Sequence, residues 1–157
     1  MIFRFNLRNS ERNKKIMNKK KTKFNFVSDE WVDQAEIILN DLVSQFGVEG
    51  VSFSVCETFS DAPKAIHTSG IASWHFYIDG KSVRVGKGKV EDVDVKINFD
   101  YAKASIIAKV IYTKKIITKQ KEGAEKAKEA LAIASKGFKE PPDYLPELHN
   151  RLALLTA

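Results

Sequence analysis

The segment that decides the fold of this chain is 72–99, ASWHFYIDGKSVRVGKGKVEDVDVKINF. Apolar side chains occupy every second position in 72–78, 83–85 and 93–99. This period of two is typical of a β-strand with one buried face. Asp79-Gly80 separates the first two runs and predicts a hairpin turn of type I′, which needs positive φ at both central positions. The segment therefore predicts three strands, and the first two pair as a hairpin.

A helix and a fourth strand precede this segment. Apolar positions recur at helical spacing in 31–46, and either Ser28 or Asp29 can cap the helix that this spacing predicts. Large apolar side chains then alternate with small polar ones in 51–56, which predicts a strand. Residues 57–70 are rich in turn formers and are interpreted as a loop.

Helices are predicted for most of the remaining chain. Asp100 can cap a helix whose apolar stripe ends near Ile111, and the Ala-rich run 122–136 predicts another that stops at Gly137. A last helix follows Asp143. Its apolar stripe consists of Leu145, Leu148, Leu152 and Leu155. Strands and helices are thus segregated, which predicts an α+β fold with a curved, mainly antiparallel sheet of about four to five strands and helices covering one face.

The formal net charge of +6 is distributed unevenly along the chain. Residues 1–23 contain nine basic side chains and one acidic side chain, whereas the remaining 134 residues contain 17 basic and 19 acidic ones. We therefore divide the chain into a basic N-terminal extension, 1–25, and a single domain, 26–157. A domain without net positive charge argues against nucleic acid as its partner.

The extension has three interpretations. It could be a disordered, solvating tail, or a start-site artefact, because Met17 could begin a chain that reads Asn18-Lys19-Lys20-Lys21. It could also be a basic arm that contacts an anionic membrane weakly or binds nucleic acid. It lacks the apolar centre of a secretory signal, and no run in the chain approaches the ~20 apolar residues that span a bilayer. Cys56 is the single cysteine, so we expect a reducing, cytoplasmic location.

Residues 72–112 resemble the lipid-binding domain of the sterol carrier protein type 2 family. The resemblance rests on the order of four features. They are the aromatic-bearing strand 74–78, the Asp79-Gly80 turn into a second strand, a polar gap leading to Asp92-Val93-Asp94-Val95-Lys96-Ile97, and an apolar helix capped by Asp100. The helix 31–46 ahead of the sheet also matches the order of the family.

The chain departs from the family pattern after this point. Members usually carry a glycine late in the helix, followed by a short strand with alternating Ile or Leu. Here the helix runs into 110–113 without a glycine, and 114–119 would be a degenerate version of that strand.

The resemblance implies a carrier that holds a lipid in an apolar tunnel between sheet and helices, without a cofactor or a metal. On this basis we expect eight residues to line the cavity: Trp74, Phe76, Ile78, Val95, Ile97, Phe99, Ile107 and Ile111. The Leu-rich last helix could serve as a lid. The same apolar side chains would also fill an ordinary closed core, so a hollow and a filled interior both remain open.

The catalytic alternative is an isomerase, cyclase or dehydratase with a cone-shaped α+β pocket. Its base would be Glu57 or Asp61, with a pKa raised by burial. The partner of that base would be His75 or Tyr77. A metal site built from these carboxylates with His67 and His75 lacks any tight ligand spacing, so none is expected.

Overall fold

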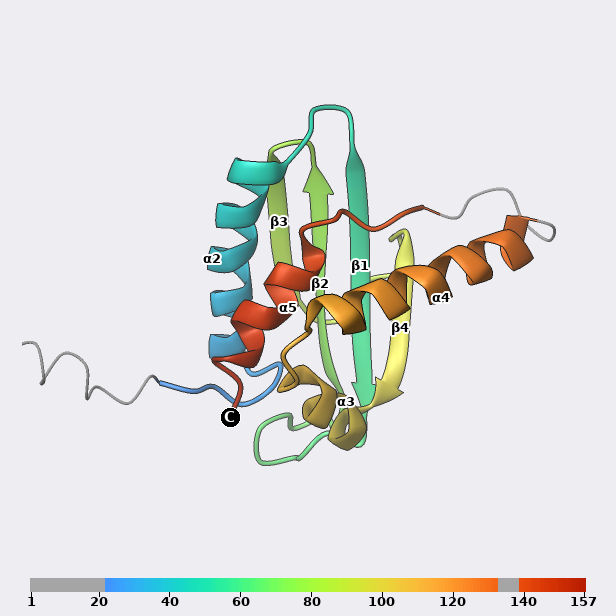
Figure 1. Ribbon diagram of the computed structural model, residues 1–157. Helices are drawn as coiled ribbons and strands as arrows, with labels where there is room; N and C mark the ends of the chain where they lie inside the picture. Colours follow the sequence, from blue (N-terminus) through green and yellow to red (C-terminus); the bar gives the residue numbers. More distant parts are fainter. Residues whose placement is uncertain (1–21, 133–138) are drawn as a thin grey trace, which may run out of the picture.

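The computed structural model describes residues 22–132 and 139–157. Its elements in chain order are α2 (Asp29–Phe46), β1 (Ser52–Ser60), β2 (Ala72–Asp79), β3 (Ser82–Lys87), β4 (Val95–Asp100), α3 (Tyr101–Ala108), α4 (Lys114–Ala132) and α5 (Leu145–Ala153) (Figure 1). The basic extension up to residue 21 and the expected helix stop at Gly137 lie outside the described residues.

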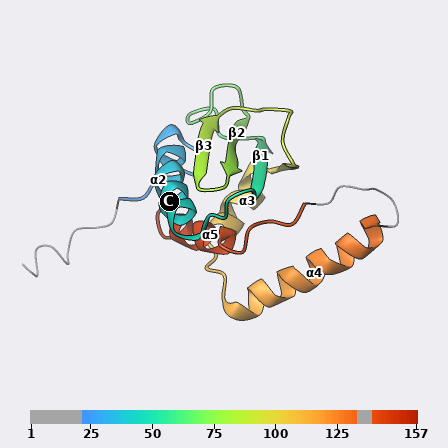
Figure 2. The same ribbon diagram turned by 90° about the horizontal axis from the view of Figure 1, so that it is seen from above.

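The four strands form one mixed sheet in the order β3-β2-β1-β4. The β1–β2 and β2–β3 pairs are antiparallel, whereas β4 lies parallel to β1. Helices α2 and α5 lie on the same side of the sheet, as two views at right angles show (Figures 1 and 2). The predicted fold class is therefore confirmed: an α+β fold with a mainly antiparallel sheet.

The hairpin between β2 and β3 is shifted by one residue from the predicted turn. Asp79 pairs with Ser82, so Gly80 and Lys81 form the two-residue loop. Gly80 has a φ of +58°, while neither Asp79 nor Lys81 has a positive φ. Positive φ at the first central position alone is the requirement of a type II′ turn, and glycine meets it without strain.

Strand β1 is longer than its sequence pattern predicts. Its alternation was expected to stop at Cys56, but Glu57, Thr58 and Phe59 continue the strand, and each pairs with a residue of β2. The interpretation of 57–70 as a loop from its first residue was therefore wrong. The cause is tertiary, because the full length of β2 supplies hydrogen-bond partners that local turn propensity cannot reveal.

The chain after β4 also differs from the sequence prediction. Helix α3 ends at Ala108, so Ile111 lies beyond it. Asn150 of α5 holds this segment, because its Oδ1 accepts a hydrogen bond from the Tyr112 amide (2.7 Å) and its Nδ2 donates to the Tyr112 carbonyl (3.1 Å). Residues 114–119, considered above as a degenerate fifth strand, begin α4 instead. The part of the chain that the structure describes forms a sheet of four strands.

Helix α2 covers the sheet and brings the two ends of the described domain together. Ser28 caps the helix by accepting a hydrogen bond from the Trp31 amide (3.2 Å). Leu39 and Leu42 on its inner face are fully buried. The indole N–H of Trp31 donates to the Thr156 hydroxyl (3.0 Å), so the last residues of the chain close the core beside the first turn of α2.

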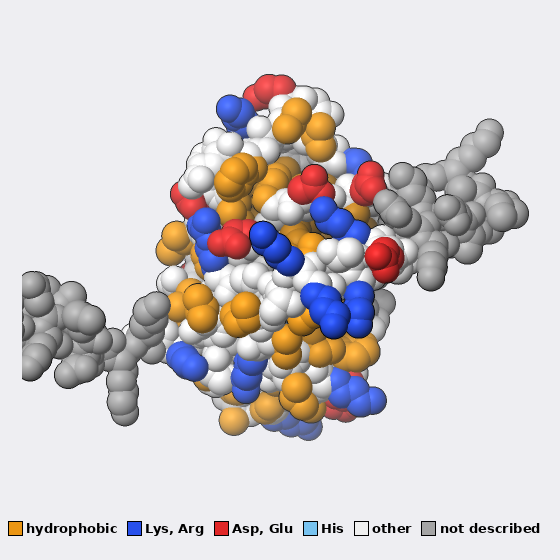
Figure 3. All heavy atoms as spheres, viewed as in Figure 1, with side chains coloured by type: hydrophobic (Ala, Val, Ile, Leu, Met, Phe, Trp, Pro, Cys, Tyr) orange, Lys and Arg blue, Asp and Glu red, His pale blue; other side chains and the backbone are white. Residues whose placement is uncertain are grey.

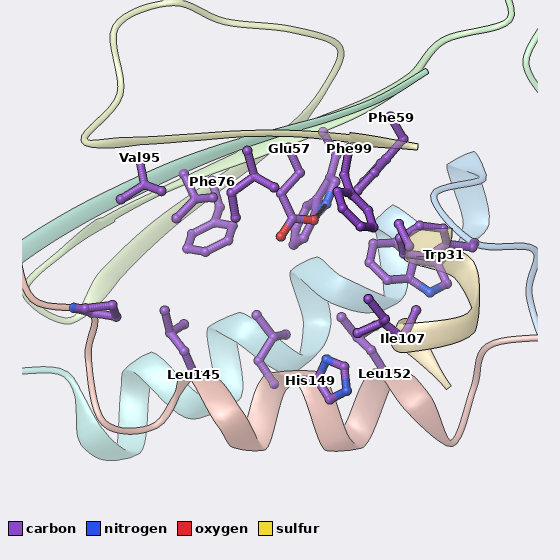
Figure 4. A pocket seen from close by; sticks show the side chains of 18 of the residues that line it. Trp31, Glu57, Phe59, Phe76, Val95, Phe99, Ile107, Leu145, His149 and Leu152 are labelled. Atoms are coloured by element: carbon purple, nitrogen blue, oxygen red, sulfur yellow. Dashed lines mark hydrogen bonds between the residues drawn. The ribbon is translucent and has the colours of Figure 1, made fainter. Parts of the chain in front are cut away.

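The connection from β3 to β4 crosses the other face of the sheet, because these strands occupy opposite edges (Figure 4). The Asp94 carboxylate accepts hydrogen bonds from the Ser54 amide (2.9 Å) and hydroxyl (3.0 Å). The Val90 amide donates to the sulfur of Cys56 (3.5 Å). The single thiol is therefore buried beneath this connection and faces away from the helices.

Candidate ligand-binding cavity

A cavity of about 480 Å³ lies between the sheet and helices α3 and α5. The sheet wall consists of alternate residues of β1, β2 and β4, because side chains of a strand point to the two faces in turn. Figure 4 shows this wall facing α5 across the cavity, with Ile107 of α3 at one end. The volume falls in the range of about 300–1,000 Å³ that is usual for small-molecule sites.

Six of the eight residues expected at the cavity lie in its wall. They are Trp74, Phe76, Val95, Ile97, Phe99 and Ile107. Their contact with a ligand stays a prediction. Since β4 is an edge strand, its side chains Ile97 and Phe99 remain about two-fifths exposed. The cavity therefore opens along the edge formed by β4 and α3.

The other two expected residues do not line the cavity. Ile78 is only 3% exposed, but it lies near the hairpin end of β2, opposite Phe53 and Val83, and belongs to the closed part of the core. Ile111 is 45% exposed, because α3 ends three residues earlier. Both errors arise because periodicity assigns a face of an element but not the position along it where the cavity ends.

Helix α5 supplies four residues of the wall opposite the sheet. Leu145, Leu148 and Leu152 line the cavity, and all three belong to the apolar stripe predicted for the last helix. Phe26 and Trp31 close one end, although the sequence did not single them out as cavity residues. Their aromatic type was the only available signal, and it is equally typical of a filled core.

Glu57 is the carboxylic acid in this largely apolar wall. It lies in the middle of β1, opposite Trp74 and in register with Ile97. Its Oε2 accepts a hydrogen bond from the Trp74 indole N–H (2.7 Å). None of the hydrogen bonds among the described residues reaches Oε1, and Figure 4 shows the carboxyl group pointing into the cavity.

Burial raises the pKa of the Glu57 carboxyl above its ordinary value of 4.5, and the hydrogen bond from Trp74 opposes this shift only in part. A raised pKa means that the cavity favours the protonated, neutral carboxyl. In that form the group can donate one hydrogen bond as well as accept them. Glu57 therefore places a hydrogen-bonding group in an apolar wall.

His149 of α5 provides a second polar group, on the opposite wall. Its Nε2 bonds the Val110 carbonyl (2.7 Å), so Nε2 carries the proton and Nδ1 is the acceptor. Burial lowers the pKa of His149, with the hydrogen bond to Val110 opposing the shift, so the neutral ring predominates at neutral pH. The ring stacks on Tyr112 with a centroid distance of 3.6 Å.

The structure separates Glu57 from the catalytic partners that the sequence indicated. His75 and Tyr77 point to the other face of the sheet, where the His75 ring bonds the Gly88 carbonyl (2.8 Å) and the Arg84 guanidinium lies over the Tyr77 ring. Asp61 is exposed just beyond the end of β1. The expected pair of Glu57 with His75 or Tyr77 is therefore wrong, because adjacent strand positions face opposite ways.

His67 lies in the β1–β2 loop, with its ring 5.7 Å from that of Tyr101, and is remote from His75 on the far face of the sheet. Among the described residues, no three or more His, Cys, Asp or Glu side chains gather closely enough to hold a metal ion.

Comparison with models of known protein families, with curated proteins and with solved structures gives no match to this chain. None of the described helices has both the length and the apolar character needed to cross a bilayer.

Proposed function

We propose that this protein binds or carries, without changing it chemically, a lipid or another elongated apolar molecule in the cavity between the sheet and α3 and α5. The observation that carries the proposal is the cavity of about 480 Å³ with mainly aromatic and aliphatic walls. Each methylene group transferred from water into such a site contributes about 0.8 kcal/mol. An acyl chain would therefore bind tightly without any reactive group.

Glu57 supplies the polar recognition in this proposal. The Trp74 indole holds Oε2, which leaves Oε1 directed into the cavity. When it is protonated, the carboxyl donates a hydrogen bond to a carbonyl, hydroxyl or carboxylate oxygen of the ligand. Nδ1 of His149 accepts one from a hydroxyl. The expected ligand therefore has a long apolar part and one oxygen-containing group that lies against the middle of β1.

Two further observations support the proposal. The strand, hairpin, strand and helix on which the resemblance to the sterol carrier protein type 2 family rests occur in the expected order, although 114–119 is helical where the family has a strand. Cys56 is a free, buried thiol, which fits the proposed cytoplasmic location.

The experiment combines native mass spectrometry of the purified protein with uptake of a fluorescent fatty acid. Ala108 lines the cavity, whereas Ala102 on the same helix is exposed. Because a bulky side chain would occupy the ligand's space, Ala108→Trp should weaken uptake by about tenfold or more, and Ala102→Trp should leave it unchanged. Protein that carries no ligand and takes up no fatty acid would contradict the proposal.

A second function, catalysis on a hydrophobic ketone, is favoured by one observation: Glu57 and His149 line the same cavity. A carboxyl with a raised pKa suits general acid–base chemistry, and such an isomerase, cyclase or dehydratase would use this pair instead of Glu57 with His75. Conversion of a hydrophobic ketone that is lost in Glu57→Gln, with binding retained, would establish this function. Binding without conversion would favour the carrier.

A further inference from the structure

An apolar patch surrounds the open side of the cavity. We call it the α3 patch, and it consists of Ile97, Phe99, Ile106, Ile107, Val110 and Ile111, each at least two-fifths exposed. Ile106 is the most exposed, at 69%. Exposed aliphatic side chains that are contiguous in this way mark an interaction surface on a monomeric domain.

The chain that carries most of this patch is strongly basic. Residues 101–121 contain six lysines and no Asp or Glu: Lys103, Lys109, Lys114, Lys115, Lys119 and Lys121. All six are exposed. Figure 3 shows lysine and apolar side chains intermixed over the part of the surface where α3 and the start of α4 lie.

Several lysines elsewhere on the domain are paired with carboxylates. Lys87, Lys89 and Lys96 each form an ion pair with an acidic side chain. In 101–121, Lys121 pairs with Asp143, whereas the other five lysines form no ion pair with the described residues. Among the described residues, the positive charge of these five lysines is therefore not paired with a carboxylate.

Helix α4 extends this basic surface outward. In Figure 2 it projects away from the sheet and from α2 and α5, and its first two turns hold four of the six lysines. The half-buried Ile116 and Ile117 lie within the same turns. The region thus combines apolar groups for insertion with cations arranged around them.

We propose that the α3 patch and the lysines of 101–121 dock the domain onto an anionic lipid bilayer, with the mouth of the cavity toward the lipids. Three patch residues, Ile97, Phe99 and Ile107, also line the cavity, so docking would place its opening at the membrane surface. This inference goes beyond ligand binding in solution, and it concerns the folded domain rather than the basic extension.

The chemistry of the surface favours a bilayer over nucleic acid. A surface that inserts between headgroups presents aliphatic side chains ringed by lysines, and each lysine near an anionic bilayer strengthens binding about fivefold. Nucleic-acid surfaces rely on arginine and on aromatic stacking. Residues 101–121 contain no arginine, and five of the six residues of the α3 patch are aliphatic, with Phe99 the single aromatic one.

The test is co-sedimentation of the full chain with vesicles of phosphatidylcholine, with and without phosphatidylserine. The full chain should bind only the vesicles that contain phosphatidylserine, and salt should weaken this binding. Replacing Lys114, Lys115 and Lys119 together by Gln should weaken it about 100-fold. Ile106→Glu should also abolish it, while Ile37→Glu, an equally exposed site on α2, should not.

Fluorescent fatty-acid uptake without vesicles distinguishes docking from ligand binding. Ile106 does not line the cavity, so Ile106→Glu should bind the fatty acid normally while losing vesicle binding. Normal circular dichroism of each variant establishes that it folds. Conversely, Ala108→Trp should lose fatty-acid uptake and bind vesicles normally, because it fills the cavity and leaves the α3 patch unchanged.

Three results would overturn the proposal. If Lys19, Lys20 and Lys21 replaced together by Gln abolish vesicle binding while the α4 variant retains it, the extension is the membrane contact. If Ile106→Glu converts a dimer to a monomer in sedimentation analysis, the patch joins two copies of this chain. If the full chain shifts a nucleic-acid duplex in gels but ignores vesicles, the partner is a nucleic acid.

Discussion

At the scale of single residues, Glu57 has the most unusual environment. Its side chain lies in an apolar wall, where charging the carboxyl costs solvation free energy that one hydrogen bond from Trp74 restores only in part. Residues of this kind rarely persist in a core for stability alone. The position is consistent with the polar role that the proposed function gives to Glu57.

The raised pKa of Glu57 predicts how stability depends on pH. The folded protein binds this proton more tightly than the unfolded chain, so the free energy of unfolding decreases as pH rises above about 4.5 toward the folded pKa. Glu57→Gln cannot ionise and should remove this decrease. Urea denaturation should show that the free energy of unfolding of the Gln variant rises relative to that of the wild type between about pH 4.5 and pH 8. If the two proteins differ in free energy of unfolding by the same amount at both pH values, Glu57 is solvated.

At the scale of elements, α5 determines where α3 ends and shapes one wall of the cavity. Its Asn150 satisfies both backbone groups of Tyr112, and its His149 bonds the Val110 carbonyl. Three backbone groups of an irregular segment are thus paired with side chains of one helix. This replaces the hydrogen bonds that a continued helix or a fifth strand would have made.

Asn150→Ala should therefore lower the free energy of unfolding by about 2 kcal/mol, because two part-buried backbone groups lose their partner. It should also weaken fatty-acid uptake, since the segment that carries Tyr112 lines the cavity. Asn40→Ala is the matched control, because Asn40 bonds a carbonyl on the exposed surface of α2 and should cost under about 0.5 kcal/mol. If both variants lose the same free energy of unfolding, the hydrogen bonds of Asn150 to Tyr112 contribute no more to stability than an exposed one.

At the scale of the whole molecule, the two ends of the described chain close one core. The Thr156 hydroxyl accepts from Trp31 (3.0 Å) and donates to the Leu152 carbonyl (2.7 Å), and the residue is only 2% exposed. Phe24 pairs with Thr156 through a parallel bridge. The position of α5, and with it the cavity wall, therefore depends on the last residues of the chain.

Thr156→Val should lower the free energy of unfolding by about 1–3 kcal/mol, because the buried indole N–H of Trp31 would lose its acceptor at nearly constant side-chain volume. Thr118→Val removes a hydroxyl that bonds the Lys114 carbonyl on the exposed surface of α4 and should change stability little. Chemical denaturation of both variants measures the difference. A stable Thr156→Val protein would argue that the C-terminal closure is not needed.

The sequence by itself determined where the four strands lie, although not the full length of β1, and which face of each strand is apolar. Alternation in 72–78 and 93–99 predicted the apolar strand faces that carry five of the cavity-lining residues, and the stripe of the last helix predicted its leucines. These predictions succeeded because backbone geometry alone sets the direction of successive side chains. No long-range contact is needed to read them.

Only the tertiary structure decided which groups meet in the cavity. The length of β1, and with it the direction of Glu57, depends on pairing with β2 and with the parallel strand β4. His149 faces Glu57 because α5 packs across the sheet, 92 residues later in the chain. Such contacts depend on the packing of segments that are distant in sequence, which no local period encodes. They bring His149 of the last helix, and not His75, to the same cavity as Glu57.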